Sequence, residues 1–160
     1  MARIDEEVRI HLSVLDRLVD FEPEVKSEPP ASRSKSLRQL KQALKRDLEW
    51  LLNTRCTFFV PEEFPALADS LLSYGLPDFS TLSVRNTEDQ HDLVRALETT
   101  LRRFEPRLED VVISVVSSSP LERALRFRIE GRLKVDPVPE PVTFDTTLLL
   151  GSGNFAVKGE

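Results

Sequence analysis

Residues 99–116, TTLRRFEPRLEDVVISVV, mark the point at which a helical pattern gives way to a strand pattern. Pro106 cannot lie inside a helix, because it lacks the backbone N–H, and it biases Glu105 away from helical geometry. Glu105 and Arg107 are therefore expected to be extended, and residues two apart in an extended chain project to the same side. The stretch predicts a carboxylate and a guanidinium presented together from a rigid corner, as assembly interfaces often need.

Two amphipathic helices are predicted before this corner. The first has Ser36 as its N-cap and continues to residue 55 without Gly or Pro. The second begins at Thr87, where Gln90 three residues later completes a capping box, and it ends at the corner. Between them, residues 56–86 look irregular, with one short helix over 66–73. The apolar residues at helical spacing are Leu37, Leu40, Leu44, Leu48, Leu51 and Leu52, then Leu93, Leu97, Leu101 and Phe104.

The first helix carries two features that each allow two interpretations. Its first half is basic, with no acid before Asp47, which fits a solvated helix face or a contact with an acidic partner. Trp50 lies nearly opposite the leucine face. The helix is then either packed on two sides, or Trp50 is an aromatic anchor for a partner, as aromatic residues often are at interfaces.

The residues after the corner alternate as strands do. Positions 111–116 form a first strand, in which Val112 and Val116 suggest burial on both faces. Residues 125–135 alternate between apolar and charged, and Gly131 among them suggests a bulge or a close neighbour. Residues 142–150 form a third strand, and 155–157 form a short strand that turns back along it. The expected fold class is α+β, with two main helices packed on a three- or four-stranded antiparallel sheet and an N-terminal arm.

Composition and segment boundaries limit the possible classes of protein. The chain has 160 residues and a formal charge of −5, which argues against nucleic-acid binding. Its single cysteine allows no internal disulfide, and no signal-peptide core or membrane-spanning stretch is present, so we expect a cytoplasmic protein without membrane insertion. Residues 1–35 are expected to form an N-terminal arm that includes a proline-rich linker over 22–32, and residues 36–160 form the main domain. Residues 8–21 of the arm are expected to form a short helix or an extended docking segment.

The sequence offers no set of residues that is typical of catalysis. His11 and His91 are the only histidines, and no cluster has the spacing of zinc ligands. Acids are plentiful, but no spacing marks two of them as a glycosidase pair. We therefore expect no enzyme activity, no metal and no cofactor.

Several short motifs, in order along the chain, resemble one family. They are SVLDRL at 13–18, DLEWLLNTR at 47–55, YGLPD at 74–78, FEPRL at 104–108 and VTFDT at 142–146. Together they resemble the TssE family of type VI secretion baseplate subunits, which is similar to the wedge protein of contractile phage tail baseplates. The resemblance extends over nearly the whole chain.

The resemblance implies a structural role. A wedge protein of this kind links the baseplate to the contractile sheath and seeds sheath assembly, in a cytoplasmic baseplate docked near the inner membrane. Glu105, Pro106 and Arg107 match the family's signature, which is associated with binding other wedge subunits. Sheath subunits are expected to bind by strand addition, at an edge within residues 142–157. An alternative is a lysozyme-like peptidoglycan hydrolase, after an older description of the family.

Overall fold

The computed structural model describes residues 10, 13–18, 33–57, 60–79, 83, 86–119 and 124–159. The helices are α1 (Val14–Leu18), α2 (Arg33–Asn53) and α3 (Thr87–Phe104), and two 3-10 turns are η1 (Pro65–Asp69) and η2 (Leu71–Ser73). The strands are β1 (Leu108–Ser119), β2 (Ala124–Leu133), β3 (Glu140–Leu149) and β4 (Asn154–Gly159). Among these residues no helix combines the length and the hydropathy needed to cross a bilayer.

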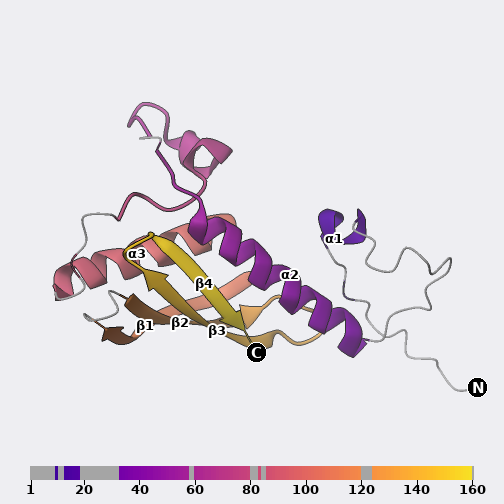
Figure 1. Ribbon diagram of the computed structural model, residues 1–160. Coiled ribbons are helices and arrows are strands. Elements are labelled where there is room, and N and C mark those ends of the chain that lie inside the picture. The colour runs from indigo at the N-terminus through magenta and orange to yellow at the C-terminus, as the bar shows by residue number, and fades with distance from the viewer. Residues whose placement is uncertain are drawn as a thin grey trace, which may run out of the picture.

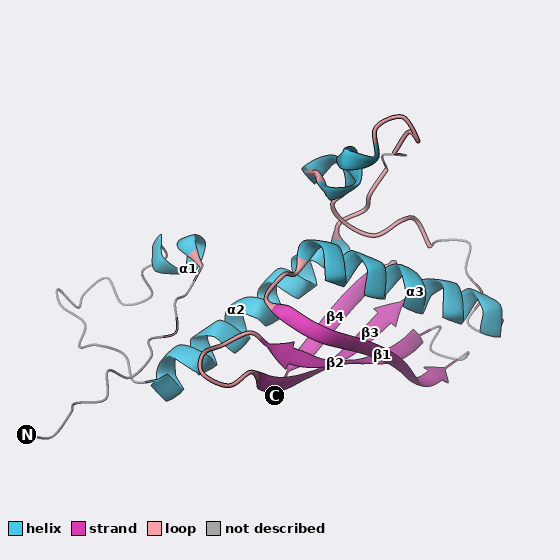
Figure 2. Cartoon of the chain, turned by 180° about the vertical axis from the view of Figure 1, so that it is seen from behind, coloured by secondary structure: helices cyan, strands magenta, loops and turns pink. Residues whose placement is uncertain are grey.

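The four strands form one antiparallel sheet in the order β1-β2-β3-β4. Helices α2 and α3 lie on one face of this sheet, α2 beside β4 and α3 beside β1, and no element of the described residues covers the other face (Figures 1 and 2). The predicted α+β class is therefore confirmed, with four strands.

The core lies between the two helices and the sheet. In β2, Leu125, Phe127 and Ile129 are buried while Arg126 and Arg128 between them are exposed, as the alternation predicts. The leucines of α2 and α3 pack against this face because they recur at the helical period. The fully buried helix residues are Leu44, Leu48, Leu52, Leu93, Leu97 and Leu101.

Two predicted helix caps are wrong. α2 begins at Arg33, so Ser36 lies within its first turns as a buried residue and not at its N-cap. α3 does begin at Thr87, but its cap is Asn86, whose side chain accepts a hydrogen bond from the Glu88 N–H at 3.0 Å. Asn is a stronger N-cap than Thr, and at the preceding position it satisfies the free N–H groups of the first turn.

Strand β1 differs from its prediction because it lies at the edge of the sheet and is covered on one face only. Val112 and Val116, expected to be buried, are 56% and 55% exposed on the open face. Two irregularities interrupt the register of β1 with β2. The first surrounds Asp110, whose φ is 52°, and it lies opposite Gly131, where a Cβ would be 3.2 Å from the Glu109 carbonyl oxygen. The prediction of a bulge or close neighbour at Gly131 is confirmed.

The edges of the sheet are β1 and β4, so the edge expected within 142–157 is present, in β4. β3 pairs on both sides, so only the part of that range in β4 lies at an edge. Each edge is partly capped by a helix side chain. The amide of Asn53 donates to the Phe155 carbonyl and accepts from its N–H, both at 2.9 Å. On β1, the Ile113 N–H donates to a carboxylate oxygen of Glu98 at 3.4 Å.

Residues 60–74, here called the lobe, project from the body between α2 and α3 (Figure 1). The single short helix predicted over 66–73 is two 3-10 turns, η1 and η2, separated by Ser70. After the lobe, Gly75 has a φ of 108°, and a Cβ there would lie 2.5 Å from the Thr54 carbonyl oxygen. Only glycine allows the chain to pass so close to the end of α2. The predicted linker at 22–32 lies outside the described residues.

Candidate functional site

The corner forms where α3 stops. The Glu105 N–H still donates to the Leu101 carbonyl at 2.9 Å, and Pro106 then ends the helix because it has no N–H to continue the ladder. The Arg107 carbonyl accepts a hydrogen bond from the Lys134 N–H at 2.8 Å, so the chain joins the sheet at once. The corner is thus fixed on one side by a helix and on the other by β2.

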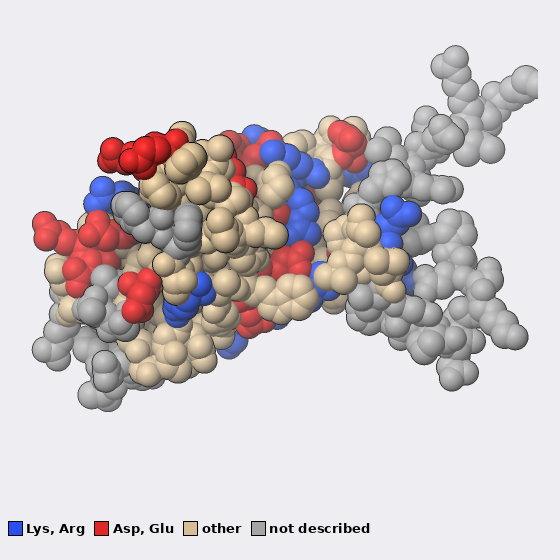
Figure 3. Space-filling model, turned by 90° about the horizontal axis from the view of Figure 1, so that it is seen from above, with Lys and Arg blue, Asp and Glu red and all other residues tan. Residues whose placement is uncertain are grey.

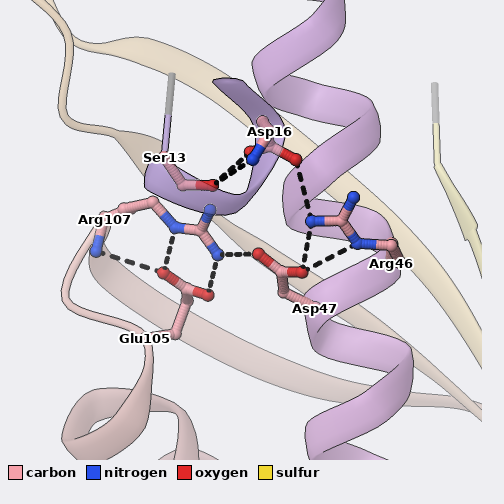
Figure 4. A network of polar contacts seen from close by, with 6 residues as sticks. All are labelled: Ser13, Asp16, Arg46, Asp47, Glu105 and Arg107. Atoms are coloured by element: carbon pink, nitrogen blue, oxygen red, sulfur yellow. Dashed lines mark hydrogen bonds and ion pairs between the residues drawn. The ribbon is translucent and has the colours of Figure 1, made fainter. Parts of the chain in front are cut away.

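Glu105 and Arg107 bind each other through two parallel hydrogen bonds (Figure 4). The guanidinium donates from Nε to Oε1 of Glu105 at 2.6 Å and from Nη2 to Oε2 at 2.5 Å. This bidentate geometry is the strongest form of a charge-assisted pair. Glu105 is only 4% exposed, whereas the side chain of Arg107 remains 26% exposed.

The pair belongs to a longer chain of alternating charges that reaches the N-terminal segment (Figure 4). Arg107 also donates to Asp47 of α2 at 2.8 Å, and Asp47 accepts from its neighbour Arg46 at 2.8 Å. Arg46 donates in turn to Asp16 of α1 at 2.9 Å. Ser13 completes the chain, since its hydroxyl donates to Asp16 at 2.5 Å. Three segments far apart in the sequence are therefore joined at one place.

The network shifts the protonation of its members toward the charged forms. Hydrogen bonding to Glu105 raises the pKa of Arg107, although burial opposes it. Burial alone would raise the pKa of Asp16, but the hydrogen bonds from Ser13 and Arg46 outweigh it and the pKa lies below the ordinary value. Tyr74, which lies nearby outside the network, is instead shifted toward its neutral form, because burial and the negative charges of Asp47 and Glu105 raise its pKa.

The structure brings Glu105, Pro106 and Arg107 together as the sequence predicts, but the charged pair faces inward more than expected. Both side chains project to one side, yet they contact each other and Asp47 first. Of the charged pair, only Arg107 offers appreciable surface to a partner, and Pro106 between the two is exposed. Their role in binding a partner stays a prediction.

Trp50 lies on α2 one turn beyond Arg46 and is 54% exposed. The guanidinium carbon of Arg46 lies 5.0 Å from the ring centroid, a distance typical of a cation–π contact. The two-sided packing considered for α2 is therefore wrong at this position, and Trp50 presents an aromatic surface to solvent. An anchoring role for it is still a prediction.

Sequence reasoning did not assign a role to three members of the network. Asp47 and Arg46 looked like ordinary polar positions of an amphipathic helix, and Asp16 lay in the arm. A signal existed for Asp47, which opens the motif DLEWLLNTR, but sequence spacing gives no indication that it lies beside Arg107, 60 residues away.

The described residues contain no group of three metal-ligating side chains. An open, polar hollow on the uncovered face of the sheet is lined by Arg128, Glu130, Thr143, Asp145, Lys158 and Gly159. Asp145 is paired there with Arg128 at 2.9 Å. Both side chains are about half exposed, so this hollow lacks the water-excluded surroundings in which carboxylates become catalytic acids.

Comparison with known proteins gives one match. The model of a family described as baseplate wedge protein gp25 matches residues 38–138, more than half of the chain. No curated protein and no solved structure matches the chain. The matched residues include most of α2, the lobe, α3, the corner and the first two strands.

Proposed function

Since this chain belongs to the baseplate wedge protein gp25 family, a structural baseplate family, we propose that it is the TssE-type wedge subunit of a type VI secretion system. In this proposal it has no catalytic activity, and it links a cytoplasmic baseplate, docked near the inner membrane, to the contractile sheath and seeds sheath assembly. The observation that carries the proposal is the sheet itself. It has two edge strands, neither of which is fully covered by the residues described.

Strand β1 is the edge that we assign to the sheath. It has 12 residues against 6 in β4, and the single hydrogen bond from Ile113 to Glu98 is long at 3.4 Å. On β4, by contrast, Asn53 makes two bonds of 2.9 Å. Val112, Val115 and Val116 of β1 are exposed, at 56%, 38% and 55%, and an added strand would cover them. Backbone pairing supplies affinity in such additions, and side chains supply selectivity.

Two matched proline substitutions test the edge. The N–H of Ile113 points to the outer edge, and that of Val115, two residues on, points the same way. Val115→Pro therefore removes a donor that only an added strand uses. Val157→Pro is its counterpart on β4, two residues after Phe155; because Val157 is 3% exposed, this variant also removes a core contact, which the folding control must address. Proline at such outward positions is tolerated on edge strands.

We expect Val115→Pro to abolish sheath assembly in cells that carry a fluorescent sheath, and Val157→Pro to leave it normal. Circular dichroism of both purified variants provides the control for folding. Loss of assembly with Val157→Pro alone would assign the sheath to β4. Normal assembly in both well-folded variants would contradict strand addition.

The corner is proposed to bind other wedge subunits through Arg107, with Trp50 as a second contact. Arg107→Lys keeps the positive charge beside Glu105 but loses the bidentate geometry, so it should weaken wedge binding by about tenfold or more. Asp47→Asn is the matched control, because it perturbs the same network from α2 without changing the exposed guanidinium. Trp50→Ala should weaken binding more than it lowers the melting temperature.

The measurement is a pull-down of the wedge subunits with each purified variant, beside its thermal unfolding curve. Binding by Arg107→Lys equal to that of Asp47→Asn, at equal stability, would show that the corner acts only inside the subunit. A large fall in melting temperature with unchanged binding in Trp50→Ala would contradict the anchoring role. No described feature favours the hydrolase alternative, and loss of turbidity in a peptidoglycan suspension would support it.

A further inference from the structure

The lobe holds three large apolar side chains in solvent. Phe64 is 61% exposed, Leu71 87% and Leu72 55%. Single exposed leucines are common on protein surfaces, but several within one small projection mark an interaction site more often. Neither the corner nor the sheet edge uses these residues.

The lobe is tied to the body, so these side chains are held outward. Asp69 forms an ion pair with Arg103 of α3 at 3.1 Å, and Tyr74 packs edge-on against Phe104 with ring centroids 5.3 Å apart. Within the lobe, the Ser73 hydroxyl donates to the Leu67 carbonyl at 2.8 Å. A surface fixed in this way loses little entropy on binding.

The negative charge of the lobe indicates what kind of surface could bind it. Residues 57–84 contain acids but no lysine, arginine or histidine, and Glu62 and Glu63 are exposed beside Phe64. A matching surface must be apolar and must carry basic residues around it.

The chain itself has such a surface at its other end. In α1, Val14 is 71% and Leu18 77% exposed. Beside it, the first half of α2 is basic; Arg38 is exposed, and Lys45, seven residues on and so on the same side of the helix, is half-buried. Figure 1 shows the start of α2 and the lobe at opposite ends of the molecule, and in Figure 3 acidic side chains gather at the end away from the start of α2.

We propose that the lobe binds a second copy of this chain, head to tail, on the surface formed by α1 and the basic half of α2. The two surfaces differ, so the contact is heterologous and successive copies form a ring or a chain. It is separate from the corner and edge contacts proposed above. The lobe is small compared with stable interfaces, so self-association is expected at high protein concentration.

Charge reversal tests the contact directly. Sedimentation equilibrium of the full chain, from about 10 µM to about 1 mM, should show reversible self-association. The double variants Glu62→Lys/Glu63→Lys and Arg38→Glu/Lys45→Glu should each weaken it at least about tenfold, because like charges then meet. An equimolar mixture of the two should restore association, since each variant supplies the charge that the other lacks.

Apolar substitutions provide the second measurement. Leu71→Ser and Leu72→Ser should weaken self-association by a similar factor with an unchanged melting temperature, whereas the matched control Val112→Thr on β1 should not. A wild-type chain that stays monomeric over the whole range overturns the proposal. It is also overturned by association that survives both charge reversals, by a mixture that stays monomeric, or by a loss with Val112→Thr alone.

Discussion

At the residue scale, Arg107 holds the corner together. Its guanidinium satisfies Glu105, which is 4% exposed, and it also reaches Asp47. An unpaired carboxylate at the position of Glu105 would be costly, since a buried charge without a partner loses its hydration without compensation. A substitution that removes the Arg107 guanidinium is therefore expected to lower the stability of the fold.

Arg107→Ala should lower the free energy of unfolding by about 2 kcal/mol, somewhat less than for a fully buried pair because the guanidinium is partly exposed. Asp47→Asn should cost about 1 kcal/mol, since the Glu105 pair survives. Urea unfolding followed by Trp50 fluorescence measures both. Equal losses in the two variants would contradict the leading role given to the Glu105 pair.

At the element scale, the helices do more than cover the sheet. Asn53, the last residue of α2, takes the place of a neighbouring strand at Phe155, and Glu98 of α3 does so more weakly at Ile113. Helix ends and faces thus satisfy part of the backbone hydrogen bonding at both outer strands.

Asn53→Ala should lower the free energy of unfolding by about 1–2 kcal/mol, because the Phe155 N–H and carbonyl both lose a partner. Asn53→Asp keeps an acceptor for the Phe155 N–H but has no donor for the Phe155 carbonyl. Its effect on the free energy of unfolding should therefore differ from that of Asn53→Ala. Amide hydrogen exchange at Phe155 reports the change locally. An unchanged exchange rate in Asn53→Ala would show that the cap is not formed in solution.

The sequence predicted elements better than the contacts between them. Alternation in 125–135 and leucine spacing in 36–55 reflect local periodicity, and both elements formed as expected. The open valines of β1 could not be predicted, because a strand's place at the edge depends on sheet order and not on its own pattern. The corner residues could be predicted because they are adjacent in the sequence. The roles of Asp16, Arg46 and Asp47 could not, because only tertiary packing brings them together with the corner.

At the scale of the whole molecule, the N-terminal segment is attached to the body by Ile10, which packs against the core, and by an ion pair from α1. α1 buries none of its residues, and a helix of five residues is not stable alone. Its recorded polar link to α2 is the Asp16–Arg46 pair. Because the pKa of Asp16 is lowered in the folded chain, this contribution is present above the ordinary value of about 3.9 and is lost as the pH falls through the folded value.

The difference in unfolding free energy between the wild type and Asp16→Asn should therefore be about 1 kcal/mol near neutral pH and should vanish in acid. Urea unfolding curves at a series of pH values below about 5 measure it. The comparison isolates Asp16 from the other carboxylates of the network, which titrate in both proteins. A difference that persists unchanged to the lowest pH would mean that Asp16 acts through something other than its charge.

The side-chain caps on the two outer strands also affect how readily the free protein aggregates. An exposed edge strand is a template on which a strand of another molecule can pair, which leads to aggregation. A cap of two hydrogen bonds on β4 deters such encounters, while one long bond on β1 yields readily to the right chain. Under the strand addition proposed above, the unequal hydrogen bonds of Asn53 and Glu98 would protect β4 from pairing and leave β1 available to a partner strand.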